Sequence, residues 1–302
     1  MKIACIGTGA MGGAIMRAVC KKYNAGDITV TDKNSEMGKK FAEETGAVFA
    51  GSNEDAIKGA DYIFIAVKPQ FLKDVFDEIK DKITGKQVVI SMAAGVKIEK
   101  LESFAPKARF IRMMPNVCAQ IGEAMTAVTS GASVTAEEFE EAKQILNAAG
   151  KVEAVPEKLM DCVTAVSGSG PAFVFMFIEA LADAAVRCGM PRSQAYTYAA
   201  QTVKGSAALV LETKNHPAVL KDSVCSPAGT TIEGVSALES NGLRNAVIQA
   251  VTAAYEKSVN LGKQHSPLNG TLFSQDKSGG KFSKIHAYNS GNQRKRNIYA
   301  AG

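Results

Sequence analysis

Residues 2–13 read KIACIGTGAMGG and place Gly7, Gly9 and Gly12 at the spacing G-x-G-x-x-G. A short apolar run precedes the glycines, and a segment rich in helix formers follows them. Asp32 closes the next apolar run, twenty positions after Gly12. A strand, a glycine turn, a helix and an acidic residue in this order are typical of a dinucleotide-binding βαβ unit.

The three glycines have separate physical tasks in such a unit. Gly7 allows the tight turn, Gly9 lets the backbone approach a pyrophosphate, and Gly12 lets the helix and strand pack closely. The free amides and the positive end of the helix dipole then face the phosphates. A purely structural glycine turn is the alternative interpretation. The predicted cofactor contacts in this turn are Gly7, Thr8, Gly9, Ala10, Met11 and Gly12.

The residues after the second apolar run leave the choice of dinucleotide open. The Asp32 carboxylate suits the free ribose 2′-hydroxyl of NAD and repels a 2′-phosphate. Lys33, with Asn34 and Ser35 beside it, could instead hold the phosphate of NADP. Asp32 could equally be a plain turn residue.

Residues 1–155 alternate short apolar runs with helix-like segments, which predicts a doubly wound α/β sheet. Two further strands, at 123–130 and 151–155, are expected at its edge. Loops at the carboxyl ends of such strands line the ligand crevice. The loops AVKPQ (66–70) and SMAAGV (91–96) therefore add Ala66, Val67, Lys68, Pro69 and Ala93 to the predicted cofactor contacts.

Residues 156–263 carry only helix-like segments, which are alanine-rich and apolar on more than one face. A small helical domain cannot hide that much apolar surface alone, so we expect a second subunit to cover it. Packing on the sheet of the same chain is the alternative. Residues 264–302 are polar, basic and aperiodic, and are expected to form a disordered tail.

The net charge of +5 lies in that tail, which holds six cations against one anion, 6 − 1 = +5. Residues 1–263 are therefore neutral overall, which argues against a nucleic-acid partner. The longest apolar stretch is interrupted by Glu179 and Asp183, so no membrane partner is expected.

The six scattered cysteines show no metal-ligand spacing and are predicted to be reduced, mostly core thiols, so no metal site is expected. Together these features predict a cytoplasmic protein.

Two predicted loops of the second half place hydroxyl and amide donors before expected helix starts. They are AVSGSGPAF (165–173) and DSVCSPAGTTIEGV (222–235). Donors at the positive end of a helix are suited to bind a carboxylate. Ordinary helix capping by serine and threonine is the alternative for each segment alone.

Taken together, the motifs resemble the pyrroline-5-carboxylate reductase family across residues 1 to about 263. The matching pieces are IGTGAMGGAI, AVKPQ, SMAAGV, RMMPN, AVSGSGPAF and DSVCSPAGTTIEGVSALESNGLRNAVIQAV, and the last two are the specific ones. The resemblance implies a Rossmann domain (1–155) and an all-α dimerisation and substrate domain (156–263) with helices like those of 6-phosphogluconate dehydrogenase. It also implies a homodimer, or a larger ring built from dimers.

The implied reaction is hydride transfer from NADPH, with NADH also possible, to the C=N carbon of L-1-pyrroline-5-carboxylate, which gives L-proline. By resemblance Thr231 is the catalytic residue and contacts the ring nitrogen. Gly229, Thr230 and Thr231 would hold the substrate carboxylate. Glu157 falls where the family has a substrate-contacting glutamate from the partner subunit, and Asn53 matches a cofactor-contacting asparagine. Ser223 stands where some members have asparagine.

Two other functions compete with this interpretation. A β-hydroxyacid dehydrogenase-like oxidoreductase would carry a lysine four residues after Gly170, but Val174 stands there. A non-catalytic NAD(P)-sensing protein would be suggested by loss of the Thr230–Thr231 pair, which is present.

Overall fold

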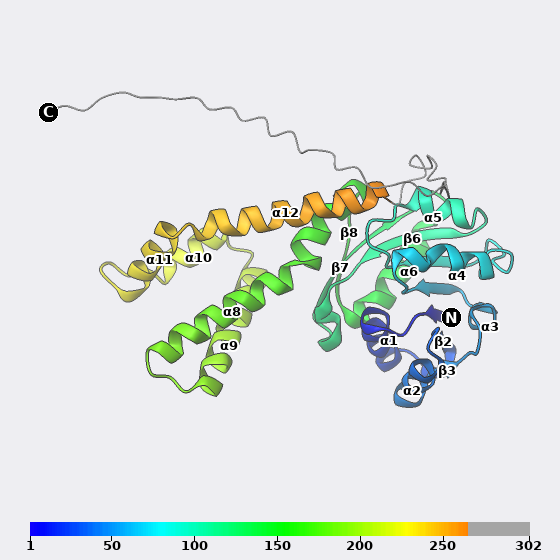
Figure 1. The fold of residues 1–302 in the computed structure, drawn as a ribbon, viewed down its shortest axis with the longest axis horizontal. Coiled ribbons are helices and arrows are strands. Elements are labelled where there is room, and N and C mark those ends of the chain that lie inside the picture. The colour runs from blue at the N-terminus through cyan, green and yellow to red at the C-terminus, as the bar shows by residue number, and fades with distance from the viewer. Residues whose placement is uncertain (265–302) are drawn as a thin grey trace, which may run out of the picture. The chain divides into compact units, whose positions relative to one another are not determined.

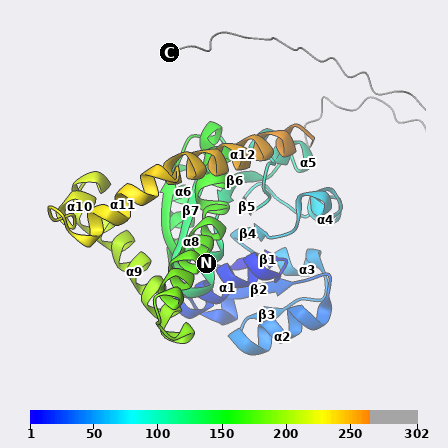
Figure 2. The ribbon, with the colours of Figure 1, turned by 60° about the vertical axis from the view of Figure 1, so that its left-hand side comes forward.

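The computed structural model describes residues 1–264, whose first half forms one eight-stranded sheet (Figures 1 and 2). The strands are, in chain order, β1 (Ile3–Ile6), β2 (Ile28–Thr31), β3 (Val48–Phe49), β4 (Tyr62–Ile65), β5 (Val88–Ser91), β6 (Arg109–Met114), β7 (Ala124–Ser130) and β8 (Gly150–Ala154). Their spatial order is β3-β2-β1-β4-β5-β6-β7-β8. Every neighbouring pair is parallel except β6 with β7.

Continuous burial explains the parallel centre of the sheet. All residues of β1, β4 and β5 are buried, as expected for strands that are covered on both faces. The predicted doubly wound sheet is therefore confirmed. The expectation of two edge strands at 123–130 and 151–155 is wrong for the first, because β7 lies between β6 and β8. A short 3₁₀ turn at Val117–Ile121 reverses the chain, so β7 pairs antiparallel with β6 and becomes internal.

Helices cover both faces of the sheet and enclose two apolar clusters. One cluster joins α1, α2 and α6 to the sheet, and the other joins α3, α4 and α5 to its opposite face. The helices of this half are α1 (Ala10–Lys22), α2 (Ser35–Thr45), α3 (Asn53–Ile57), α4 (Leu72–Ile79), α5 (Ile98–Phe104) and α6 (Ala136–Leu146).

After β8 the described chain is helical. Its helices are α7 (Met160–Val163), α8 (Gly170–Arg187), α9 (Arg192–Thr213), α10 (Pro217–Ser223), α11 (Thr230–Ser240) and α12 (Leu243–Gln264). The change from strands to helices falls between Ala154 and Glu157, near the predicted domain boundary, which stays a prediction. The tail beyond residue 264 lies outside the described residues.

The SGSG segment is helical rather than a loop, contrary to the sequence expectation. Residues Thr164–Gly168 form a π-helical turn that joins α7 to α8. The Ser169 amide donates to the carbonyl of Thr164, and the Ser167 hydroxyl donates to the carbonyl of Met125 on β7. These donors therefore serve the helix and its anchorage to the sheet.

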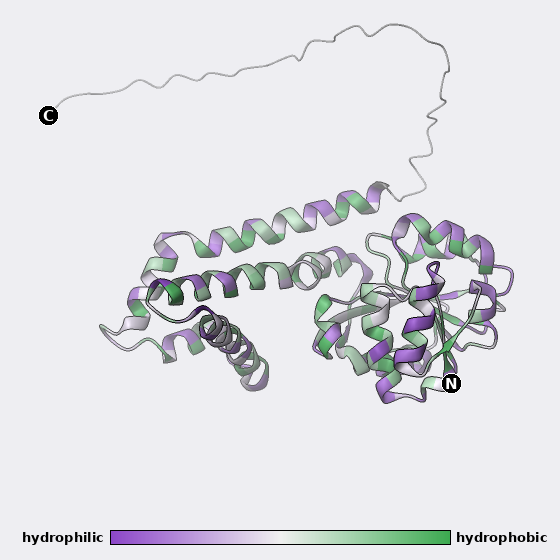
Figure 3. Cartoon of the chain, turned by 60° about the horizontal axis from the view of Figure 1, so that its bottom comes forward, coloured by the Kyte–Doolittle hydropathy of each residue, from purple (hydrophilic) through white to green (hydrophobic). Residues whose placement is uncertain are grey.

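The helical half leaves most of its apolar side chains exposed in the single chain. Figure 3 shows that hydrophobic residues recur along its helices. Met176 on α8 is 68% exposed and Leu211 on α9 is 66% exposed, and α11 contains no buried residue. By length and composition alone, residues Glu157–Arg187 could cross a membrane. An apolar surface of this kind indicates an interaction face.

Helix α12 connects the two ends of the helical half. Near its carboxyl end the Ser258 hydroxyl donates to Asp161 on α7 at 2.7 Å, and Gly262 packs against Gly95 of the sheet half. Its other end carries α11 and α10 (Figures 1 and 2).

The cysteines differ from the expectation of mostly core thiols. All six are free, but only Cys5 is buried, and Cys162 and Cys188 are exposed. Both exposed cysteines belong to the helical half, whose surface the single chain does not cover.

Candidate active site

The glycine turn packs directly against the end of β4. Gly7 has a φ of +103°, and a Cβ there would lie 2.6 Å from the carbonyl oxygen of Ala66. A Cβ on Gly12 would lie 2.3 Å from the Gly7 oxygen and 2.5 Å from the Ala66 Cβ. Neither position can accept a side chain without a backbone shift, which accounts for the first and third glycines of the motif.

Gly9 differs from both, because a Cβ at this position would meet no atom within 4 Å. It is the N-cap of α1 and offers no side chain to the first amides of that 13-residue helix. An open space in front of free amides at a positive helix end fits a pyrophosphate. The residues present therefore fit a dinucleotide at the predicted position.

Asp32 ties the end of β2 to this turn. Its Oδ2 accepts hydrogen bonds from the Thr8 amide at 2.7 Å and the Thr8 hydroxyl at 3.0 Å. Its Oδ1 accepts from the Asn34 amide at 2.9 Å. Since each carboxylate oxygen has two acceptor sites, only Oδ1 retains one for a ribose hydroxyl. Asp32 thus has a structural task whichever dinucleotide binds.

The neighbouring polar residues also have partners within the chain. The Lys33 ammonium lies 5.7 Å from the centroid of the Phe71 ring, and the Asn34 side chain caps α2. The Asn53 side chain donates to Glu78 at 2.7 Å. Lys33 remains exposed at the carboxyl end of β2, where a 2′-phosphate would lie.

The other predicted cofactor residues follow β4 and β5 at the same edge of the sheet. The Ala66 amide donates to the carbonyl of Ile6 on β1, which continues the sheet into the crevice. Lys68 and Pro69 begin a 3₁₀ turn, and Ala93 is buried after β5. The structure therefore brings together the glycine turn, the end of β2 and both loops.

The predicted substrate loop begins α11. Thr230 and Thr231 form its first turn and are exposed residues, whereas the Gly229 amide donates to the carbonyl of Ser226 at 3.1 Å. Ala228 has a φ of +54°, an unusual value for a residue with a side chain. The loop is thus held in a strained turn, as ligand-binding loops often are.

The substrate loop lies far from the glycine turn within one chain. α11 packs at the amino end of α12, whereas Gly262 near the other end contacts Gly95. The 1.5 Å rise per residue places Leu243 and Gly262 about 28 Å apart along α12. The single chain therefore does not unite the predicted carboxylate-binding amides with the predicted cofactor crevice.

Glu157 makes contacts inside its own chain. Its Oε1 accepts from the Ile98 amide at 2.8 Å and from Arg112 Nη1 at 3.2 Å. These two hydrogen bonds join the first residues after β8 to the start of α5 and to β6. A substrate contact by Glu157 stays a prediction.

Sequence reasoning did not assign roles to Asn116 or Ser167. Asn116 follows β6 and is 8% exposed; its Nδ2 donates to the Ser167 hydroxyl at 3.2 Å. Its Oδ1 is buried and has no partner among residues 1–264. The available signal was its place in RMMPN, directly after β6, whose parallel neighbour β5 ends in a predicted cofactor loop.

Cys5 lies beneath the turn, where its thiol donates to the Gly7 carbonyl at 3.4 Å. Burial raises the pKa of this thiol, and the nearby Asp32 carboxylate raises it further. The group is therefore a neutral packing residue rather than a nucleophile. Among residues 1–264, no group of three or more His, Cys, Asp or Glu is placed to hold a metal.

A dinucleotide turn at the switch point between β1 and β4, followed by a helical domain, defines a class: the NAD(P)-dependent oxidoreductases with a Rossmann domain and an α-helical partner domain. Two family models match the chain. One is described as pyrroline-5-carboxylate reductase dimerisation and covers residues 157–261. The other is described as NADP oxidoreductase, coenzyme F420-dependent, and covers residues 2–95.

Curated relatives match over most of the chain. A pyrroline-5-carboxylate reductase of Methanosarcina acetivorans is 43% identical over 266 residues, which are 87% of this chain and 98% of the relative. The Escherichia coli pyrroline-5-carboxylate reductase is 44% identical over 265 residues, with the same coverage of 87% and 98%. This chain belongs to the pyrroline-5-carboxylate reductase family.

Solved structures agree with this assignment. The Plasmodium falciparum pyrroline carboxylate reductase with NADP bound has a TM-score of 0.78 at 31% identity, over 87% of this chain and 98% of that one. A pyrroline-5-carboxylate reductase from Coxiella burnetii has a TM-score of 0.80 at 34% identity, over 88% and 98%. The predicted fold, NAD(P)H cofactor and homodimer are thereby confirmed, and the exposed helical half is the family's dimerisation domain.

Proposed function

We propose that this protein reduces L-1-pyrroline-5-carboxylate to L-proline with NAD(P)H, the last step of proline synthesis. Family membership along both halves of the chain carries this proposal. NAD(P)H supplies a hydride, which adds to the carbon of the C=N bond, while one proton goes to the ring nitrogen. The product is the saturated amino acid together with the oxidised dinucleotide.

The cofactor would be held by the residues around the glycine turn. The open space at Gly9 and the first amides of α1 suit the pyrophosphate, and Asp32 keeps Thr8 and the turn in place. The Oδ1 of Asn116, which has no partner in the described part of the chain, suits an amide donor such as the nicotinamide carboxamide. Lys33 suits a 2′-phosphate, and the remaining acceptor site of Asp32 suits a free ribose.

The substrate would be held by α11. The first-turn amides of Thr230 and Thr231 suit its carboxylate, while Gly229 shapes the turn through its bond to Ser226. The Thr231 hydroxyl would orient the ring nitrogen. A neutral hydroxyl is a weak acid, so water is the proton source that we favour. Fixing both reactants in one geometry can lower the barrier by roughly 7–11 kcal/mol in the best cases.

The separation along α12 requires that two subunits build each site. The α11 loop of one chain would then serve the cofactor crevice of its partner. This arrangement also covers the apolar faces of α8 and α9. It accounts for the apolar segment Glu157–Arg187 as part of the interface, because that segment lies wholly within the matched dimerisation domain. We further propose that the protein acts in the cytoplasm.

The test follows NADPH and NADH oxidation with pyrroline-5-carboxylate, then with 2-keto acids and 3-hydroxy acids. Turnover of the cyclic imine alone is expected. Thr231→Ala should lower turnover by about 100-fold with little change in cofactor affinity, because only the imine loses its orienting group. Thr231→Ser keeps the hydroxyl and serves as the matched control. Unchanged turnover in Thr231→Ala would remove Thr231 from the mechanism.

A further inference from the structure

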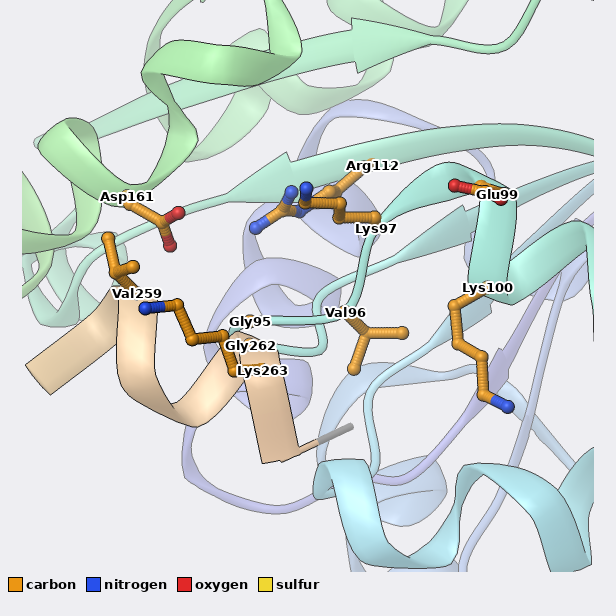
Figure 4. Close-up of a pocket in the computed structure, with 10 residues that line it drawn as sticks. All are labelled: Gly95, Val96, Lys97, Glu99, Lys100, Arg112, Asp161, Val259, Gly262 and Lys263. Atoms are coloured by element: carbon orange, nitrogen blue, oxygen red, sulfur yellow. The ribbon is translucent and has the colours of Figure 1, made fainter. Parts of the chain in front are cut away.

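A pocket of about 220 Å³ lies where the sheet domain meets the end of α12 (Figure 4). Its walls are the loop of Gly95 to Lys97, Glu99 and Lys100 at the start of α5, Arg112 on β6, Asp161 on α7, and the segment of α12 from Val259 to Lys263. The loop follows Ala93 after β5, so the pocket adjoins one wall of the predicted cofactor crevice. None of the pocket-lining residues belongs to the predicted cofactor or substrate contacts.

Arg112 is a nearly buried cation with unused donors. It lies on β6 between Ile111 and Met113, which face the opposite cluster, so it shares the α5 face with Phe110. It is 5% exposed, and its hydrogen bond among residues 1–264 is the one from Nη1 to Glu157. Since a guanidinium has five N–H donors, most of them have no protein partner in the described chain. Figure 4 shows the guanidinium aimed into the pocket.

Two lysines add positive charge to the same space. Lys97 extends toward the guanidinium of Arg112, and Lys263 extends from α12 toward Asp161 (Figure 4). Neither lysine forms an ion pair with any residue of the part of the chain that the structure describes. Asp161 accepts from Ser258, and Glu157 is held by Arg112 and Ile98. Glu99 and Lys100 also line the pocket, so with Glu157, the partner of Arg112, four cations face three carboxylates and one positive charge is uncompensated.

We propose that this pocket binds a small oxyanion, a carboxylate or a phosphate group. A planar guanidinium offers two parallel N–H bonds that match either group, and charge-assisted bonds of this kind are strong. Lys97 supplies the second charge beside it. The low exposure of Arg112 protects such an ion pair from screening by solvent.

A bound anion would connect three segments that share few polar contacts in the described chain. They are the loop after β5, strand β6, and the junction of α7 with α12. Binding would therefore stabilise the attachment of the dimerisation domain and fix the loop beside Ala93. The site takes no part in hydride transfer, so its failure would leave the proposed function intact.

The experiment uses the full-length protein saturated with NADP⁺, which occupies the other phosphate-binding site. Inorganic phosphate and acetate are titrated separately by calorimetry, with chloride at the same ionic strength as the reference. Lys97→Gln is expected to weaken anion binding about tenfold, the loss of one charge-assisted bond. Lys263→Gln should weaken it as well. Lys151→Gln, an exposed charge on β8, is the matched control and should change nothing.

Arg112→Gln should abolish binding, and Lys97→Gln carries the test if that variant does not fold. Stronger binding of phosphate identifies a phosphate ester as the ligand class, and stronger binding of acetate identifies a carboxylate. The proposal is overturned if neither anion binds beyond the chloride reference. Binding that is equal in the wild type, Lys97→Gln and Lys263→Gln would place the anion elsewhere and would overturn it too.

Discussion

The two halves of this chain differ in the burial of their apolar side chains. In the sheet half, Phe110 and Ile90 are fully buried, whereas in the helical half Met176 and Phe175 are 68% and 57% exposed. The first half encloses two continuous cores, and the second encloses one small cluster of three buried alanines. One half therefore completes its own core and carries the glycine turn, while the other gains its core by association.

The largest effect is expected from a charge on the helical surface. Met176→Glu or Leu211→Glu would bury an unpaired carboxylate at the dimer interface, so the dimer should dissociate. Turnover should fall more than about 100-fold, because each site would lack its partner's loop. Sedimentation and kinetics measure both effects, and cofactor binding should persist.

Val48→Glu is the matched control for those variants. Val48 is 47% exposed on the edge strand of the sheet half, where no interface is expected. The Val48→Glu variant should therefore remain dimeric and active. If Met176→Glu were a fully active monomer, the helical half would not need a second subunit, contrary to this account.

The next effect concerns the glycine turn. Gly12→Ala forces a Cβ to within 2.3 Å of the Gly7 oxygen, so stability should fall by about 3 kcal/mol and cofactor binding should be lost. Gly9→Ala meets no protein atom, so stability should be retained while its methyl group weakens cofactor binding. Thermal unfolding and cofactor titration separate the two outcomes. Equal stability losses in both variants would refute the separate roles of the glycines.

A smaller effect is expected at Asp32. Asp32→Ser removes the acceptor of Thr8 and Asn34, so affinity for both dinucleotides should fall by about tenfold. The carboxylate also repels a 2′-phosphate, so NADPH should lose less affinity than NADH. Dissociation constants for both cofactors measure this ratio. An unchanged ratio would leave Asp32 with its structural role alone.

The smallest effect is expected on the rates at which the cysteines are alkylated. Because burial raises the pKa of Cys5, its thiol should resist alkylation at pH 8 in wild type and in Met176→Glu alike. Cys162 and Cys188 are exposed in the single chain and should react faster in the dissociated variant than in the dimer. Mass spectrometry of the labelled peptides reports each rate. Rapid labelling of Cys5 in the folded dimer would contradict its burial.

The sequence was most informative where local rules decide the structure. The glycine spacing and the buried apolar runs predicted the sheet and the turn, because both depend on steric and burial rules that are local. The internal position of β7 was missed, since strand order depends on the path of the chain after β6. The π-helical turn at Thr164–Gly168 was taken for a loop, because glycine and serine favour loops unless tertiary contacts such as Ser167 to Met125 override them.

The site shows the same division. Gly7, Gly9 and Gly12 could be assigned tasks from spacing alone, and the structure gives each a matching environment. The ion pair of Arg112 with Glu157 joins residues 45 apart, and no sequence rule links them. The distance between the α11 loop and the crevice likewise depends on the length and direction of α12, which only the fold reveals.

The most direct measurement is subunit complementation. One inactive variant, Gly9→Asp, places a carboxylate in the cofactor phosphate site, and the other, Thr231→Ala, impairs the substrate loop. In a mixed dimer, a site built across subunits can combine the intact crevice of one chain with the intact loop of the other. Refolding an equal mixture should then restore about a quarter of the wild-type activity. If the mixture is no more active than its two parents, each chain uses its own loop, and a site shared between subunits is excluded.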